Sequence, residues 1–279
     1  MSHPATAAAW NGLSALAGLL AEGGVVVLTG AGISTDSGIP DYRGSTGAAR
    51  RNTPMTYQTF VGDATARQRY WARSFLGWRQ ISHARPNAGH LAVAQLQRRG
   101  ALSGIITQNV DGLHQRAGAL DVIELHGGLD RTVCLGCGES RPRAELDAAL
   151  RALNPNFAAD ARQLNPDGDV DLPDEALREF FVACCAVCGS DLLKPDVVFF
   201  GESVPLDRVT RSFGLVTQAA CVLVLGSSLT VFSGYRFVRA AARASIPVAI
   251  VNQGPTRADG LATVRIDGPL GDVLPRLVG

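Results

Sequence analysis

The sequence predicts an α/β protein in which a parallel β-sheet carries helices on both faces and a second, smaller domain is inserted. Short apolar runs recur along the chain, helical patterns alternate with them, and two stretches interrupt this alternation. At 279 residues the chain has the length of about two ordinary domains.

Six runs have the composition of buried strands, because they are short, apolar and mostly β-branched. They are Val25–Thr29, Gly104–Thr107, Val122–Leu125, Val222–Leu225, Val248–Val251 and Thr263–Ile266. Helices are expected at Asn87–Arg99, Leu206–Ala219 and Tyr235–Ala244, and in an alanine-rich segment near the N-terminus. This alternation is typical of nucleotide-binding folds with a parallel sheet.

Two stretches break the alternation: Asp41–Ser82, which is rich in aromatic residues and arginine, and Leu129–Asp196, which holds two pairs of cysteines. We expect these stretches to form the smaller domain. In residue numbers, the sheet domain is expected to comprise 1–41, 91–127 and 203–279, and the smaller domain 42–90 and 128–202.

Charge and hydropathy exclude several classes of protein. Hydrophobic residues make up 46% of the chain, charged residues 18%, and the net charge is +1, which argues against disorder and against nucleic-acid binding through bulk positive charge. The apolar runs are far shorter than the roughly 18 residues of a membrane span. Because no basic region precedes an apolar stretch at the N-terminus, we expect a cytoplasmic protein with no membrane or nucleic-acid partner.

A glycine-rich turn follows the first expected strand. The run Gly30-Ala31-Gly32-Ile33-Ser34 offers backbone N–H groups that can approach a phosphate, although a plain turn is the alternative. Dehydrogenase chemistry is disfavoured, because Thr35 stands where a third glycine is expected and no acidic ribose ligand follows. The chain continues through Asp41-Tyr42-Arg43, where Arg43 is either a phosphate or ribose ligand or a solvated surface residue.

Polar residues also follow other expected strands, where ligands bind in open α/β sheets. Gln108-Asn109-Val110-Asp111 is such a run: Asn109 can position a ligand hydroxyl or water, and Asp111 can accept a hydrogen bond from a carboxamide. Capping of the next helix is the alternative for both. The strand ends at Gly226-Ser227-Ser228 and Asn252 are suited to the adenosine half of a dinucleotide.

His126 directly follows the expected strand Val122–Leu125 and precedes two glycines, so its ring is expected at the same edge of the sheet. Histidine titrates near neutral pH and can take a proton from a sugar hydroxyl. Surface or packing roles are expected for the remaining histidines, which are His3, His83, His90 and His114.

Four cysteines form two C-x-x-C pairs, Cys134 with Cys137 and Cys185 with Cys188. Together they can supply four thiolates to one tetrahedral Zn²⁺, and such a closed site has a structural role. Disulfides are the less favoured alternative in a chain without an export signal. Cys221, in an expected strand, is interpreted as a small buried apolar residue.

An apolar extended segment, Lys194–Glu202, leaves the cysteine-rich stretch. Two interpretations remain open for it. Its edge can pair with a substrate peptide as an added strand, or it is a linker with one packed face.

Taken together, these residues resemble the sirtuin family from about Gly23 to the C-terminus. The resemblance is carried, in the family's order, by Gly30–Arg43, Gln108–Gly118, Leu125–Gly127, the two cysteine pairs, Pro195–Glu202, Gly226–Ser228 and Val251-Asn252. It implies a Rossmann-like large domain and a small domain made of a zinc ribbon and a helical module. It also implies an NAD-dependent protein-lysine deacylase that uses NAD⁺ as a co-substrate and acylated lysine peptides or proteins as substrates, and that holds one structural Zn²⁺.

The resemblance further implies roles for individual residues. His126 would deprotonate a ribose hydroxyl, Asn109 would orient ribose and water, and Asp111 would hold the carboxamide of nicotinamide. The implied NAD⁺ site comprises Gly30, Ala31, Gly32, Ile33, Ser34, Asp41, Tyr42, Arg43, Gln108, Asn109, Val110, Asp111, Gly226, Ser227, Ser228, Asn252, Gln253, Gly254 and Leu270. The implied substrate contacts are Val198, Phe199, Phe200, Gly201 and Glu202.

Four stretches are similar to the class II branch of the family, to which the fourth human sirtuin, a mitochondrial enzyme, belongs: Arg67–Arg73, Asn165–Val170, Ser233–Phe237 and Gly254–Arg257. The first contains Tyr70 and Arg73 in the Tyr-x-x-Arg pattern of sirtuins that take acidic acyl chains, so we hypothesise that Arg73 pairs with a distal carboxylate. Protein ADP-ribosylation and a non-catalytic NAD⁺ or ADP-ribose sensor are the alternative functions.

Overall fold

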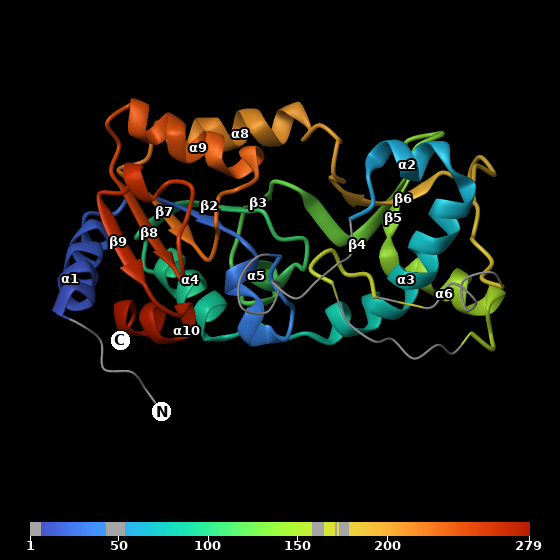
Figure 1. Ribbon diagram of the computed structural model, residues 1–279, viewed down its shortest axis with the longest axis horizontal. Coiled ribbons are helices and arrows are strands. Elements are labelled where there is room, and N and C mark those ends of the chain that lie inside the picture. The colour runs from blue at the N-terminus through green and yellow to red at the C-terminus, as the bar shows by residue number, and fades with distance from the viewer. Residues whose placement is uncertain (1–6, 43–53, 158–164, 171, 173–178) are drawn as a thin grey trace.

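Six parallel strands form the large sheet of the protein, in the order β3-β2-β1-β7-β8-β9 (Figure 1). The computed structural model describes residues 7–42, 54–157, 165–170, 172 and 179–279. The strands are β1 (Val25–Thr29), β2 (Leu102–Thr107), β3 (Val122–Glu124), β7 (Cys221–Leu225), β8 (Val248–Asn252) and β9 (Val264–Asp267). This is the Rossmann order, in which the chain leaves β1 in one direction and later returns to its other side at β7.

Helices cover both faces of the sheet, as expected. Alternate residues of β1 enter two separate cores, because successive strand side chains point to opposite faces. One core packs against α1 (Ala7–Glu22), α4 (Ala88–Arg98), α10 (Leu270–Val273) and the 3₁₀ turn η4 (Leu274–Leu277). The other packs against α8 (Leu206–Thr217) and α9 (Phe232–Arg243) (Figure 1).

A second, antiparallel sheet lies beyond the end of the large one, in the order β5-β4-β6 (Figure 1). Its strands are β4 (Gly127–Cys134), β5 (Ser140–Pro142) and β6 (Leu193–Val197). Three helices surround it: α2 (Tyr57–Gly62), α3 (Ala64–His83) and α6 (Arg143–Leu153). They share a third core, which is rich in aromatic side chains such as Trp71, Phe75 and Phe180.

Several element ends differ from the sequence-based expectation. Asn87 and Arg99 are the caps of α4 and lie just outside it, while β2 begins two residues earlier than expected, at Leu102. The largest shift is in α9, which begins at Phe232 instead of Tyr235. Ser233 and Gly234 are weak helix formers, so local propensity gave no signal for this first turn.

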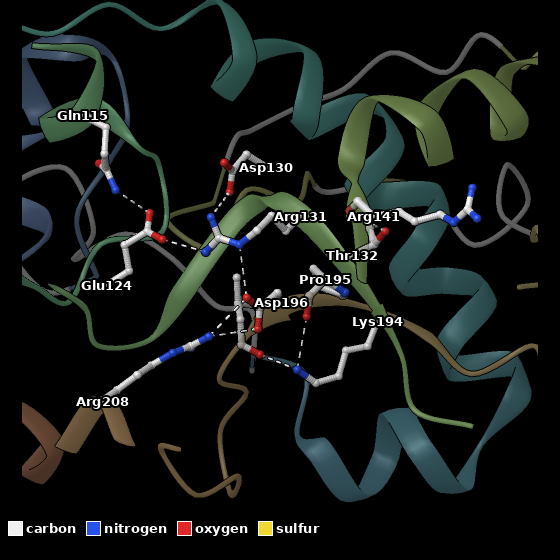
Figure 2. A network of polar contacts seen from close by, with 11 residues as sticks. Gln115, Glu124, Asp130, Arg131, Thr132, Arg141, Lys194, Pro195, Asp196 and Arg208 are labelled. Atoms are coloured by element: carbon white, nitrogen blue, oxygen red, sulfur yellow. Dashed lines mark hydrogen bonds and ion pairs between the residues drawn. The ribbon is translucent and has the colours of Figure 1, made fainter. Parts of the chain in front are cut away.

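The junction between the two sheets lies at His126 and Gly127, between β3 and β4. A Cβ on Gly127 would lie 1.8 Å from the carbonyl oxygen of Asp196, and the φ of Gly127 is +83°, so this close approach requires glycine. Figure 2 shows the ion pairs around it: Arg131 reaches both Glu124, at 2.6 Å, and Asp196, at 3.3 Å, and Arg208 also contacts Asp196, at 3.1 Å. These contacts tie β3, β4, β6 and α8 together.

Among the described residues, no helix is long and apolar enough to cross a membrane.

Candidate active site

A cavity of about 980 Å³ opens where β1 and β7 end. It lies at the point where the strand order reverses, which is where open α/β sheets bind ligands. Its size is at the upper end of the range for small-molecule sites. Its wall includes the turn after β1, the residues after β2, and the segment from Val197 to Glu202.

The turns after β1 and β7 approach each other closely, and this approach is possible because glycines occupy three positions where a side chain would not fit. A Cβ on Gly30 would lie 2.7 Å from the Ser227 side chain, and one on Gly32 would lie 2.9 Å from Gly226. The N–H of Gly32 donates to the carbonyl of Gly226 at 2.8 Å. After Gly30 the chain forms the short 3₁₀ turns η1 (Ala31–Ile33) and η2 (Thr35–Ser37) in place of a long helix.

His126 lies at the wall of the cavity with both ring nitrogens hydrogen-bonded. Its Nδ1 lies 2.9 Å from the carbonyl oxygen of Gln108, and its Nε2 lies 2.7 Å from the hydroxyl of Ser233. Because a carbonyl only accepts, Nδ1 carries the proton and Nε2 has the lone pair, toward which the Ser233 hydroxyl donates. Burial lowers the pKa of His126 to about 4, with the positive charges of Arg236 and Arg208 acting in the same direction. The ring is therefore neutral at pH 7 and able to accept a proton at Nε2.

Ser34 connects the polar residues that follow β2. Its hydroxyl donates to a carboxylate oxygen of Asp111 at 2.7 Å and accepts from the amide of Asn109 at 3.1 Å. Asp111 also accepts at 2.9 Å from the N–H of Leu113, the first residue of α5 (Leu113–Arg116), whose N-cap is Gly112, and it lines the cavity at the same time. Burial raises the pKa of Asp111, although these two hydrogen bonds oppose the shift.

Two histidines for which sequence analysis expected surface or packing roles lie directly behind this cluster. His90 and His114 are buried, with ring centroids 5.0 Å apart. His90 lies 3.5 Å from the Ser34 hydroxyl, and His114 Nε2 lies 3.0 Å from the hydroxyl of Thr29. Burial lowers the pKa of His90 to about 3 and that of His114 to about 4, so both rings are neutral packing groups. His83 is exposed on α3, and His3 lies outside the described residues.

Lys194, the only lysine of the chain, anchors the segment that forms the far wall of the cavity. It is buried, its Nζ donates to the carbonyl of Val197, and it pairs with Glu202 at 3.2 Å. The N–H of Val198 donates to the carbonyl of His126 at 2.8 Å, which joins the segment to the histidine. At the outer end Phe200 is 42% exposed and forms a parallel bridge with Thr56.

The four predicted zinc ligands lie together beside the antiparallel sheet. All four Sγ atoms are within 4.8 Å of one another, with Cys134 to Cys188 at 3.6 Å and Cys137 to Cys185 at 3.7 Å. A disulfide requires about 2.05 Å between sulfurs. A tetrahedron with Zn–S bonds of about 2.3 Å has edges of about 3.8 Å, so the donor set fits Zn²⁺. Cys184 is exposed outside the cluster, and Cys221 is buried in β7.

Most of the residues singled out from the sequence line this one cavity. They are Gly30, Ala31, Gly32, Ser34, Asp41, Tyr42, Gln108, Asn109, Val110, Asp111, His126, Val198, Phe199, Phe200, Gly201, Glu202, Gly226, Ser227, Ser228, Asn252, Gln253, Gly254 and Leu270.

Four residues predicted to contact NAD⁺ or substrate do not line the cavity or cannot be placed. Ile33 is buried in the core against α4, and Arg43 lies outside the described residues. Tyr70 and Arg73 are not part of the wall: Tyr70 is buried among Phe60, Trp71 and Phe199, and Arg73 is half-buried.

Among the wall residues that were not predicted as site residues are Ser233 and Asp167. Both residues lie in stretches for which the sequence indicated only a similarity to the class II branch, with no role at the site. Because α9 was expected to begin only at Tyr235, no pattern placed Ser233 at the sheet edge.

Comparisons with known proteins agree on the family. The model of the Sir2 family matches residues 30–233. The "NAD-dependent protein deacetylase 1" of Streptomyces coelicolor is 59% identical over 262 residues, which cover 94% of this chain and 87% of that protein. The "NAD-dependent protein deacetylase 1" of Corynebacterium efficiens is 55% identical over 245 residues, covering 86% of this chain and 87% of that protein.

Solved structures show the same fold. A structure described as "Sir2-p53 peptide-NAD+" superposes with a TM-score of 0.76 at 31% identity and covers 95% of this chain and 96% of that one. Another, described as "Sir2 bound to acetylated peptide", gives 0.74 at 30% identity with the same coverage. The chain therefore belongs to the Sir2 family.

Proposed function

We propose that this protein is an NAD-dependent protein-lysine deacylase, which transfers the acyl group of a modified lysine to ADP-ribose and releases nicotinamide. The observation that carries the proposal is the neutral His126, whose Nε2 lone pair lies at the wall of a strand-end cavity beside Asn109. The names of the Streptomyces and Corynebacterium relatives and the peptide-bound and NAD⁺-bound Sir2 structures support it.

NAD⁺ supplies an activated ribose carbon whose bond to nicotinamide can break. In the proposed site, the backbone of Gly30 to Ser34 faces the phosphates, and Asp111 and Asn109 orient the carboxamide and the ribose. His126 accepts the proton of a ribose hydroxyl at Nε2, while Gln108 holds the other nitrogen as a donor. Asn252, Gln253 and Gly254 line the same cavity and are assigned to the adenosine half.

The acylated peptide is proposed to add a strand along the segment from Val198 to Glu202. Met55 and Asp167, from the part of the chain around the antiparallel sheet, line the same cavity as Gly30 and Gly226. This supports the proposed division into a sheet domain (1–41, 91–127, 203–279) and a smaller domain (42–90, 128–202), with NAD⁺ and peptide meeting between them.

We further propose that the chain belongs to the class II branch. Two of its stretches with class II character contact each other: the guanidinium of Arg257 lies 4.3 Å from the ring centroid of Tyr235. A third, Asn165–Val170, forms a turn in which the Asn165 amide donates to Asp169 at 2.6 Å, and Asp167 of that turn lines the cavity. Ser233, Gly254 and Asp167 of these stretches line the cavity, which supports the proposal.

The test is to incubate the protein with NAD⁺ and a panel of acyl-lysine peptides, following nicotinamide release and identifying the products by mass spectrometry. Release of nicotinamide together with O-acyl-ADP-ribose is expected. His126→Ala should lower the deacylation rate by about 10²-fold or more, whereas His83→Ala, an exposed histidine on α3, should not. Product found solely as an ADP-ribosylated protein, or no nicotinamide release with any peptide, would contradict the proposal.

A further inference from the structure

The hydroxyl of Ser233 is hydrogen-bonded to Nε2 of His126, the ring nitrogen that acts as an acceptor. The two groups are 2.7 Å apart, a short hydrogen bond, and both residues line the cavity. Ser233 lies in the first turn of α9.

This contact has a direct consequence for the base. In neutral His126, Nδ1 carries the proton and donates to Gln108, so Nε2 offers one in-plane lone pair. With Nδ1 as the donor, Ser233 is the donor to Nε2 in the neutral ring. A ribose hydroxyl that gives its proton to Nε2 needs the same lone pair and the same approach direction, and both hydroxyls cannot have them at once.

Close packing holds the backbone of Ser233 in place. A Cβ on Gly234 would lie 2.5 Å from the amide oxygen of Gln108, so the first turn of α9 rests directly on the residue that also bonds His126. The Nε of Arg236 donates to the Ser233 carbonyl at 3.1 Å. The hydroxyl itself is on a single rotatable bond, and rotation about χ1 moves it from one staggered position to another.

We propose that Ser233 is a positioning residue that holds the Nε2 lone pair of His126 in the ligand-free protein and releases it to a ribose hydroxyl of NAD⁺ on binding. The inference rests on the proposed function. The charged groups around the ring are Arg236 on α9 and Arg208 on α8, with Arg208 paired to Asp196 on β6 (Figure 2). The Nε of Arg236 donates to the Ser233 carbonyl and Arg208 donates to Asp196, so the hydrogen bond at Nε2 comes from the Ser233 hydroxyl.

Three variants and three measurements test the inference. Ser233→Ala removes the hydroxyl, whereas Ser233→Thr and Ser233→Val are a matched pair of similar shape that differ in keeping or losing it. ¹⁵N NMR of histidine-labelled, ligand-free protein reports whether Nε2 of His126 accepts a hydrogen bond. Calorimetry gives the Kd of NAD⁺, and steady-state kinetics give kcat. Ser82→Ala, which removes an exposed hydroxyl on α3, is the control.

In Ser233→Ala and Ser233→Val, the Nε2 resonance should change in the free protein, and the Kd of NAD⁺ should fall about fivefold because the ribose no longer displaces an internal hydrogen bond. The kcat should stay within about threefold, and Ser233→Thr should restore the wild-type Kd and resonance. An unchanged resonance, or an unchanged Kd, overturns the inference. A kcat loss above about tenfold at unchanged Kd also overturns it, because the hydroxyl would then take part in the chemistry.

These readouts separate the inference from the proposed function. A wild type that releases no nicotinamide refutes the deacylase assignment, while the resonance of the free protein and the Kd of NAD⁺ still test the role of Ser233. A wild type that deacylates normally, with variants that bind NAD⁺ as it does, refutes the role of Ser233 alone.

Discussion

At the scale of single residues, His126 shows how its surroundings set its protonation. Its folded-state pKa of about 4 lies below the ordinary histidine value of about 6.5 mainly because of burial; the hydrogen bond to Gln108 opposes the shift, and two nearby arginines add to it more weakly. We therefore expect kcat/KM for deacylation to stay independent of His126 ionisation between pH 7.5 and 5.5. The measurement is a pH–rate profile with circular dichroism confirming the fold at each pH. An acid limb with an apparent pKa near 6.5 would contradict it.

Arg73 is the residue on which acyl specificity depends in our hypothesis, and its neighbours are acidic. The pKa of Asp169 is raised to about 7 by burial and the charge of Asp167, while Arg73 lowers it. An acidic acyl chain must therefore compete with Asp169 for Arg73. We expect Arg73→Met to lower the turnover of glutaryl-lysine relative to acetyl-lysine by about tenfold, and Asp169→Asn to raise it. A ratio unchanged in both variants would exclude the pairing.

At the scale of elements, α9 depends on one glycine. The Gln108 amide that Gly234 approaches is itself fixed by hydrogen bonds to Ser227, at 3.0 Å, and to Thr29, at 3.2 Å. We expect Gly234→Ala to displace the first turn of α9, lower kcat by about tenfold or more, and cost about 1–3 kcal/mol of stability. Chemical denaturation and kinetics measure both effects.

The matched control lies on the neighbouring helix. A Cβ on Gly214 of α8 would meet no atom within 4 Å, so Gly214→Ala should keep full activity and raise the free energy of unfolding by about 0.5–1 kcal/mol. If both variants behave alike, the close approach of Gly234 is not what positions α9.

Sequence analysis predicted some elements and site residues and missed others, and the difference depends on whether a feature leaves a local pattern in the sequence. Buried strands such as β1 and β7 are continuous apolar runs, and the residues after a strand end lie at one edge of the sheet, so the residue pattern predicted the sheet and the strand-end part of the cavity wall. Gln253, Gly254 and Leu270 were expected there because of the resemblance to sirtuins. Ser233 and His114 reach the site through packing between distant elements. Neither carries a local pattern, and the polar helix α3 was not predicted because its buried face belongs to the third core, around the antiparallel sheet.

At the scale of the whole molecule, the antiparallel sheet depends on its cysteine cluster. Because metal binding energy at such a site is folding energy, we expect a chelator or Cys137→Ser to unfold the part of the chain around β4 to β6 and to lower the melting temperature. Metal content and thermal unfolding are the measurements. Cys184→Ser, next to Cys185 but outside the cluster, should change neither. A Cys137→Ser protein with full stability and no bound metal would refute the assignment.

Three neutral histidines, two buried and one half-buried, also make the stability of the whole fold depend on pH. His90, His114 and His126 have folded pKa values of about 3, 4 and 4, below the unfolded value of about 6.5. Between pH 6.5 and pH 4 the unfolded chain binds more protons than the folded chain. The contribution of these histidines to the free energy of unfolding is therefore fully present above pH 6.5 and is lost as the pH falls toward 4. Each histidine contributes up to about 1.4 kcal/mol per pH unit.

We therefore expect the melting temperature to fall steadily from pH 6.5 to 4.5. His114→Gln, whose amide can still donate toward Thr29, should flatten that dependence because it removes one of the three titrating groups, whereas the exposed His83→Ala should leave the slope unchanged. Thermal unfolding across this range, at constant ionic strength, is the measurement. A melting temperature that is flat or rises toward pH 4.5 would show that the rings behind the cavity are not held neutral, and the assignment of His126 as a neutral base would lose its physical ground.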